Sequence, residues 1–251
     1  MANKKSNPRL TKNDLSYTEE MEKHFGIAKG TNYEKMTAFT RFVSRQNLSI
    51  FLSRYELYKK ILEVQGSIVE CGVFRGAGLF TWAHLSAIFE PYNHKRKIIG
   101  FDTFEGFPGI HNNDKTKVSN LEMKAHGFKY EYMQDLVESA RLYDMNRPLG
   151  HIPKIDLVKG DATKTIPKYI KDNKHLVVSL LYLDFDLYAP TKAAIENIIT
   201  RMPKGAIIAF DELDDQRWPG ETVAVLESLG IHNLEIKRFP FVPEISYAVI
   251  K

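Results

Sequence analysis

Cysteine is nearly absent from the sequence, with Cys71 as the single example among 251 residues. A disulfide within the chain is therefore excluded, which suits a protein of the reducing cytoplasm. Long apolar runs are absent too. The sequence contains no stretch of about 18 apolar residues, the length that a membrane span requires. The N-terminus, Met-Ala-Asn-Lys-Lys, lacks the apolar segment of a secretory signal. We therefore expect a cytoplasmic protein without membrane contact.

An excess of charge of one sign is also missing. The chain has 35 Lys and Arg residues against 31 Asp and Glu residues, and the formal net charge of +4 is spread along the sequence. Nucleic-acid-binding proteins usually gather basic side chains on one face, so we expect no nucleic-acid partner. The short basic run Lys95-Arg96-Lys97 is predicted to be a solvated loop before a strand.

Apolar residues follow helical spacing in some segments and strand spacing in others. Helices are predicted between residues 37 and 64, with Gly66 as the stop signal. Beyond Gly66, strands are predicted at 67–70, 97–101, 155–159, 175–183 and 206–210, with a closing pair at 234–239 and 245–250. Helices are predicted between them at 79–89, 131–143, 163–172, 191–201 and 221–229. This alternation indicates an α/β fold: a seven-stranded, mostly parallel sheet with helices on both faces and an antiparallel last strand.

Two segments fall outside this alternation. Residues 1–30 are polar and show no clear periodicity. Together with the helices up to residue 65, we interpret them as an N-terminal arm that packs on a partner, which favours a homo-oligomer. Residues 66–251 then form the main domain. Within it, residues 106–150 are too long for a simple connection, and insertions of this length usually serve as lids or binding loops.

A glycine-rich loop follows the first predicted strand. Residues 70–78 read Glu-Cys-Gly-Val-Phe-Arg-Gly-Ala-Gly, and ligands of open α/β sheets bind beyond such strand ends. A dinucleotide loop has the spacing G-x-G-x-x-G, whereas this loop has G-x-x-x-G-x-G with an acid, Glu70, before the first glycine. That acid would repel a pyrophosphate but suits a cationic ligand such as S-adenosylmethionine, which carries a sulfonium and an ammonium. A plain tight turn is the alternative.

Single acids follow the next two strands. Asp102, after the second strand, can accept both ribose hydroxyls of an adenosine, or it can cap a turn. Asp161, between Gly160 and Ala162, can accept the adenine amino group. It can equally cap the helix that is predicted to begin near Thr163.

Paired acids end the fourth and fifth strands. Asp184 and Asp186 are separated by one residue and so point the same way on an extended chain, and Asp211-Glu212 ends the neighbouring strand. Crowded carboxylates repel one another, and a hard divalent cation with oxygen ligands removes that repulsion. Mg²⁺ is the natural candidate, and Mn²⁺ can substitute. Solvated loop acids are the alternative, although the apolar residues before each pair argue against it.

Taken together, these motifs resemble the macrocin O-methyltransferases (TylF-like), which methylate sugar hydroxyls in antibiotic and nucleotide-sugar pathways. The resemblance runs from about Tyr33 to Glu221. It is carried by Ile-Val-Glu-Cys-Gly-Val-Phe-Arg-Gly at 68–76, Phe-Asp-Thr-Phe-Glu-Gly-Phe-Pro at 101–108, Leu-Asp-Phe-Asp-Leu-Tyr at 183–188, Thr191 and Asp211-Glu212. It implies a class I, Rossmann-like methyltransferase domain at 66–251, with S-adenosylmethionine as methyl donor, Mg²⁺ as metal and a small sugar as acceptor.

The resemblance also implies a donor site. Its residues are Glu70, Gly72, Val73, Phe74, Arg75, Gly76, Asp102, Thr103, Gly160, Asp161, Ala162 and Asp184. Within this set, Glu70 and Gly72 would lie against the methionine part of the donor. Asp102 and Thr103 would hold the ribose, and Asp161 would lie near the adenine. Arg75 can contact the donor carboxylate or an acceptor phosphate, and a structural salt bridge is equally open to it.

A metal site and a base are implied next to the donor. Asp184, Asp211 and Glu212 would hold Mg²⁺. Asp186 would act as the general base that removes the proton of the sugar hydroxyl. The chain departs from the family in one of these positions, because the family usually has Asp-Asp where this chain has Asp211-Glu212. The segment 214–220 also differs from the usual glycine-rich one.

Two other functions are compatible with the motifs. The first is a metal-dependent O-methyltransferase that acts on a catechol-like or other small acceptor, since such enzymes use a similar acidic trio. The second is a non-catalytic or NAD-binding protein built on the same kind of sheet, which would bind NAD and would not respond to removal of a metal.

Overall fold

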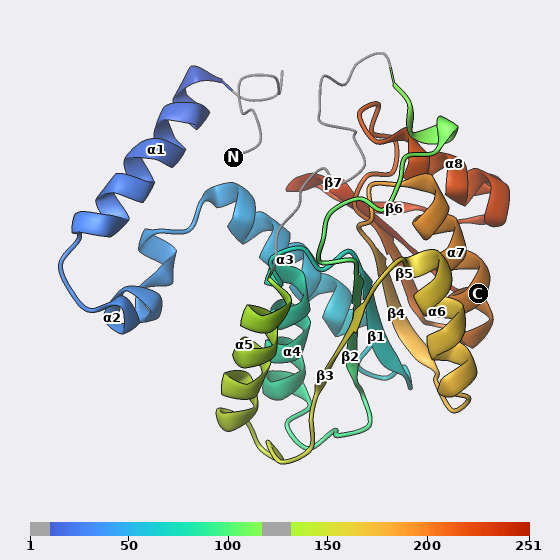
Figure 1. The fold of residues 1–251 in the computed structure, drawn as a ribbon, viewed down its shortest axis with the longest axis horizontal. Coiled ribbons are helices and arrows are strands. Elements are labelled where there is room, and N and C mark those ends of the chain that lie inside the picture. Colours follow the sequence, from blue (N-terminus) through green and yellow to red (C-terminus); the bar gives the residue numbers. More distant parts are fainter. Residues whose placement is uncertain (1–10, 117–131) are drawn as a thin grey trace.

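A seven-stranded sheet forms the centre of the structure, a computed structural model that describes residues 11–116 and 132–251 (Figure 1). The strands are β1 (Ser67–Cys71), β2 (Ile98–Asp102), β3 (Ile155–Lys159), β4 (Val178–Leu183), β5 (Ile207–Phe210), β6 (Lys237–Phe239) and β7 (Val242–Val249). Their order across the sheet is β3-β2-β1-β4-β5-β7-β6. Strands β1 to β5 are parallel, and β7 is antiparallel to both of its neighbours. The predicted α/β fold is confirmed.

Helices cover both faces of this sheet (Figure 1). One face carries α3 (Arg45–Lys60), α4 (Ala77–Phe89) and α5 (Met133–Met145), and the other carries α6 (Ala162–Asp172), α7 (Tyr188–Ile198) and α8 (Pro219–Ser228). Successive side chains of a strand point to opposite faces. Ile68 therefore packs with the first group of helices and Val69 with the second. Apolar runs buried on both faces are the pattern expected of parallel strands.

The N-terminal segment contains two helices that stand apart from the sheet in Figure 1, α1 (Lys12–Ile27) and α2 (Asn32–Thr37). Residues 12–27 show no clear apolar periodicity, so the helix there was not predicted. A capping box marks its start, since Thr11 Oγ1 accepts the Asp14 N–H at 3.2 Å and the Asp14 carboxylate accepts the Thr11 N–H at 2.8 Å. Among the described residues, no helix combines the length and the apolar character that crossing a membrane requires.

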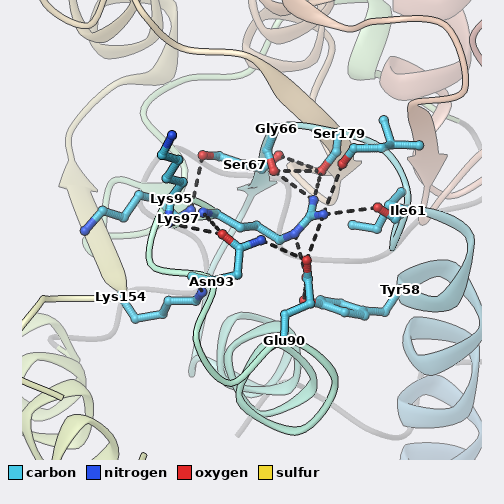
Figure 2. Close-up of polar contacts among 12 residues, drawn as sticks. Tyr58, Ile61, Gly66, Ser67, Glu90, Asn93, Lys95, Lys97, Lys154 and Ser179 are labelled. Atoms are coloured by element: carbon cyan, nitrogen blue, oxygen red, sulfur yellow. Dashed lines mark hydrogen bonds and ion pairs between the residues drawn. The ribbon is translucent and has the colours of Figure 1, made fainter. Parts of the chain in front are cut away.

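Arg96 lies in the interior, so the prediction of a solvated loop at residues 95–97 is wrong at this position. Its side chain is 3% exposed. Figure 2 shows the groups around it. The guanidinium donates to the carbonyl oxygens of Ile61, Val64 and Gly66, to Ser179 Oγ and to the Glu90 carboxylate. Arg96 therefore links the chain that follows α3 to the first residues of β4 and the end of α4.

Candidate active site

A cavity of about 300 Å³ lies beyond the carboxyl ends of β1, β2 and β4. This is where open α/β sheets bind their ligands. All residues of the predicted donor site line this cavity except Gly76 and Asp161. Asp186 lines it as well. Asp161 caps α6 instead, with its Oδ1 accepting the Thr163 N–H at 3.0 Å, and its role toward an adenine stays a prediction.

Asp102 holds the glycine loop in place. Its Oδ2 accepts the N–H groups of Val73 and Phe74, both at 2.8 Å, and its Oδ1 accepts the N–H of Phe104 at 2.7 Å. Phe74 and Phe104 both have a positive φ, 49° and 54°, so these turns need such support. Asp102 therefore caps the turns, as the alternative interpretation of the sequence predicted. The role of Asp102 toward the ribose of the donor stays a prediction.

Two glycines allow polar groups to crowd around the cavity. Gly72 has a φ of +97°, and a Cβ there would lie 1.9 Å from the Asp184 carbonyl oxygen. A Cβ on Gly78 would lie 1.9 Å from Glu70 Oε1. Any larger residue at either position would therefore displace the end of β4 or the Glu70 side chain.

Glu70 is a buried acid on the cavity wall. Its side chain is 1% exposed, and its Oε2 has no hydrogen-bond partner among the described residues. Burial raises the pKa of Glu70 to about 8, although the nearby Arg54 acts in the opposite direction. A buried carboxylate with one oxygen left without a partner suits a ligand that brings a positive charge.

The cavity also contains Arg54, which comes from α3 and was not predicted. Its Nη2 lies 4.0 Å from Glu70 Oε1 and 3.7 Å from Asp184 Oδ2. A signal for it exists in the sequence, because Arg54 occupies the apolar stripe of α3 together with Leu57, Tyr58 and Ile61. A charged residue within such a stripe has to find a buried partner or a ligand.

Three carboxylates converge between the ends of β4 and β5. Asp184, Asp186 and Glu212 each offer one oxygen, and these oxygens lie within 4.8 Å of one another. Asp186 has a φ of 63°, so the extended backbone assumed for the pair 184 and 186 is wrong. The turn into α7, rather than strand alternation, brings the two acids together. Asp211 turns toward the Tyr182 hydroxyl, which donates a hydrogen bond to it.

The acids raise one another's pKa values. Burial raises the pKa of Asp184 and of Glu212 well above the usual range, and neighbouring carboxylates add to the effect. Burial also raises the pKa of Asp186 to about 7. Glu221, a further acid that was not predicted, is fully buried and accepts the Glu212 N–H at 3.0 Å. Its pKa is raised by burial and by Asp211. A divalent cation would relieve this crowding.

The first part of the predicted lid packs against the starts of α7 and α8. Phe107, Leu187 and Trp218 form a small apolar cluster there. Buried Asp114 accepts the Tyr188 N–H at 2.6 Å, and Thr116 Oγ1 donates to the Gln216 carbonyl oxygen at 2.7 Å. The segment 107–116 thus borders the side of the site where the acids lie. Residues 117–131 of the predicted lid lie outside the described residues.

Comparison with known proteins extends the sequence resemblance. The family model of macrocin O-methyltransferase (TylF) matches residues 45–227. A crystal structure of CalS11, a calicheamicin methyltransferase, is 34% identical, with a TM-score of 0.91 over 96% of this chain and 94% of that one. An apo structure of CalS11, described as TDP-rhamnose 3′-O-methyltransferase, is 31% identical, with a TM-score of 0.84 over 98% of each chain.

A more distant match supports the fold alone. The O-methyltransferase NovP is 17% identical, with a TM-score of 0.64 over 80% of this chain and 79% of that one. A comparison with curated protein sequences found no significant match. The family match covers most of the chain, including the glycine loop, Asp102 and both acidic strand ends. The chain therefore belongs to the macrocin O-methyltransferase family and is an O-methyltransferase with the class I fold.

Proposed function

We propose that this enzyme transfers a methyl group from S-adenosylmethionine to a hydroxyl group of a sugar, with Mg²⁺ as its metal. The observation that carries the proposal is the meeting, at one end of the sheet, of the buried acid Glu70 with the cluster Asp184, Asp186 and Glu212. A sugar acceptor is supported by CalS11, which is described as acting on TDP-rhamnose. A nucleotide sugar or a glycoside is therefore the acceptor class that we propose.

The donor fits the residues of the cavity. The Glu70 Oε2 atom, which has no hydrogen-bond partner among the described residues, offers an acceptor to an ammonium group, and Gly72 lines the cavity next to it. An acid in this position disfavours a pyrophosphate, which argues against the NAD-binding alternative. Membership of a methyltransferase family argues in the same direction.

A divalent cation fits the acidic cluster. An ion held about 2.1 Å from each oxygen separates its ligands by roughly 3 to 4 Å, close to the spacing of at most 4.8 Å in the cluster. Glu212 Oε2 is buried without a hydrogen-bond partner among the described residues. Asp184 and Glu212 would hold the ion. Asp211 stays a predicted third ligand, although its carboxylate accepts the Tyr182 hydroxyl.

Asp186 is the proposed general base. When bound, Mg²⁺ lowers the pKa of a coordinated hydroxyl and fixes its orientation. The Asp186 carboxylate removes the hydroxyl proton as the oxygen–methyl bond forms and the methyl–sulfur bond breaks, which yields the methyl ether and S-adenosylhomocysteine. Burial, which raises the pKa of Asp186 to about 7, makes this carboxylate a stronger base than one in water.

An activity assay on defined acceptors tests the proposed function. With S-adenosylmethionine and Mg²⁺, we expect methyl transfer to at least one nucleotide sugar or glycoside. Mass spectrometry detects the methylated product. Because the metal activates the acceptor, EDTA should lower the rate by at least about 100-fold, and added Mg²⁺ should restore it. Transfer to a catechol and to no sugar would establish the catechol alternative. A protein that binds no S-adenosylhomocysteine in a thermal-shift assay would contradict the proposal altogether.

The metal-free protein should become less stable as the pH rises from about 5 to about 8. The folded-state pKa values of Asp186 and Glu70, about 7 and about 8, lie above the ordinary values of 3.8 and 4.5 for these side chains. Folding therefore favours the protonated acids, and this contribution is lost as the pH passes through the raised values. Mg²⁺ binds the deprotonated acids, so its stabilising effect should grow over the same range.

Thermal unfolding at three pH values, with EDTA or with Mg²⁺, measures both trends. We expect the Tm in EDTA to fall with pH and the gap between the two conditions to widen. A Mg²⁺ effect that is the same at every pH would argue against a metal on this cluster.

The N-terminal segment has apolar side chains that its own chain leaves exposed. Ile27, Tyr33 and Met36 are 83%, 73% and 60% exposed, and their helices stand apart from the sheet (Figure 1). We propose that α1 and α2, which belong to the arm predicted at residues 1–65, pack on a second copy in a homo-oligomer. Because α3 packs on the sheet and brings Arg54 to the cavity, we group it with residues 66–251 in the methyltransferase domain. We also propose a cytoplasmic location, because a chain with a single cysteine suits a reducing compartment.

A further inference from the structure

Arg54 is a buried cation that lies on the wall of the cavity. Its side chain is 9% exposed and it lines the cavity together with Glu70 and Asp184. A guanidinium has five N–H donors, yet among the described residues Arg54 Nε has no partner. Its nearest carboxylate oxygens lie 3.7 and 4.0 Å from Nη2, beyond the range of a direct hydrogen bond. The described residues therefore leave the hydrogen-bonding capacity of this side chain only partly used.

Aromatic rings hold the guanidinium in this position. Arg54 Cζ lies 4.8 Å from the ring centre of Tyr182 and 5.9 Å from that of Trp82. Both rings are fully buried, and Tyr182 is fixed further by its hydrogen bond to Asp211. Stacking on rings orients a guanidinium without using its N–H donors. The site thus presents a rigid fork of donors, which matches the geometry of a carboxylate.

We propose that Arg54 binds the carboxylate of the donor's methionine part, while Glu70 binds the ammonium on the same carbon atom. The inference rests on the proposed function, because it assigns a role toward S-adenosylmethionine. The ammonium and the carboxylate of an amino acid need an acidic and a basic side chain next to each other. The side chains of Glu70 and Arg54 meet at Gly78. A Cβ on that glycine would lie 1.9 Å from Glu70 Oε1 and 2.9 Å from Arg54 Nη2.

The start of α4 supplies a second reason for an anion in this place. Its N-cap, Gly76, provides no side-chain hydrogen bond to the first turn, and the N–H groups of a first turn favour a negative charge. Ala77 and Gly78, the first residues of α4, both line the cavity. A carboxylate between Arg54 and this turn would meet donors from both sides.

Arg75 is the other arginine of the cavity wall. It is exposed, and its guanidinium lies against the rings of Phe74 and Tyr132, 5.0 and 5.7 Å from their centres. An exposed cation attracts a carboxylate less strongly than a buried one because water screens it. The carboxylate contact considered for Arg75 from the sequence therefore belongs to Arg54.

A pair of ligands that differ only in the carboxylate tests this assignment. Calorimetric titration of the full chain with S-adenosylhomocysteine and with its decarboxylated analogue gives the ratio of the two Kd values. For the unmodified protein we expect the analogue to bind roughly 10- to 100-fold more weakly, the range of one or two charge-assisted hydrogen bonds. In Arg54→Met this ratio should fall to about 1 to 3, and in Arg54→Lys it should be intermediate.

Two matched variants show whether the effect is specific. Glu70→Gln should weaken both ligands while the ratio stays high, because both ligands keep the ammonium. Arg75→Met should leave the ratio unchanged. Circular dichroism verifies that each variant is folded, and Arg54→Lys carries the test if Arg54→Met does not fold. A ratio that stays high in the Arg54 variants would overturn the assignment, as would a ratio that falls in Arg75→Met. Failure of both ligands to bind the unmodified protein would instead contradict the proposed donor.

Discussion

Replacing Asp186 with asparagine is expected to lower kcat by roughly 100- to 10,000-fold, the usual contribution of a general base. Asparagine has nearly the same shape but cannot take up the hydroxyl proton. It also tolerates a positive φ well, so the backbone at Asp186, with φ 63°, should keep its conformation. The Kd of S-adenosylhomocysteine should change by less than about threefold, since Glu70 and the glycine loop are untouched. Initial rates at saturating donor and Mg²⁺ measure the effect.

Asp214→Asn is the matched control for this experiment. Asp214 is an exposed acid that also has a positive φ, 68°, and it is absent from the cavity wall. We expect this variant to keep nearly full activity. Near-full activity in Asp186→Asn would show that Asp186 is not the base. A loss that high Mg²⁺ concentrations repair would identify Asp186 as a metal ligand instead, an outcome that the cluster of Asp184, Asp186 and Glu212 makes worth testing.

Replacing Arg96 with methionine is expected to lower the free energy of unfolding by about 3 to 5 kcal/mol, the usual cost of removing one partner of a buried ion pair. The change would leave the Glu90 carboxylate, whose Oε2 is 2.7 Å from Arg96 Nε, without its cation. It would also take the Arg96 donors away from the carbonyl oxygens of Ile61, Val64 and Gly66. The Ile61 oxygen would keep the Val64 N–H and the Gly66 oxygen would keep the Ser179 hydroxyl as donors. Urea denaturation followed by circular dichroism measures the loss.

Two further variants show whether the loss of stability comes from the buried ion pair. Arg141→Met removes an exposed arginine that pairs with Glu138 one turn away on α5, and we expect no measurable change in the unfolding midpoint. Adding Glu90→Gln to Arg96→Met should recover part of the loss, because it removes the unpaired charge. A change below about 1 kcal/mol in Arg96→Met would mean that water replaces the lost donors, and that Arg96 does not hold α3 to the sheet.

Strands buried on both faces were predictable because their apolar residues form continuous runs. The fourth strand, β4, was placed correctly except for its start, which was predicted at His175 and lies at Val178. Leu176 and Val177 continue the apolar pattern but precede the first residue of β4. A pattern of side chains reports burial, and it reports backbone pairing only indirectly.

The partners of the two buried arginines were not predictable in the same way, although the place of Arg54 in an apolar stripe indicates that it is buried. Arg96 sits between two lysines and therefore resembles part of a solvated run. Arg54 lies on a helix that the apolar pattern assigned to the N-terminal arm, away from the main domain. Each is buried because several partners from distant parts of the chain surround it, and no local spacing reveals such partners.

The sequence by itself determined the alternation of strands and helices, the glycine loop and the acids at two strand ends, because each depends on spacing within a few residues. The tertiary structure decided which groups meet. It joined Asp186 to Asp184 and Glu212 through a turn and directed Asp211 to Tyr182. It also brought Arg54 from α3 to the cavity. These contacts depend on how elements far apart in the chain pack together, and side-chain periodicity does not encode that packing.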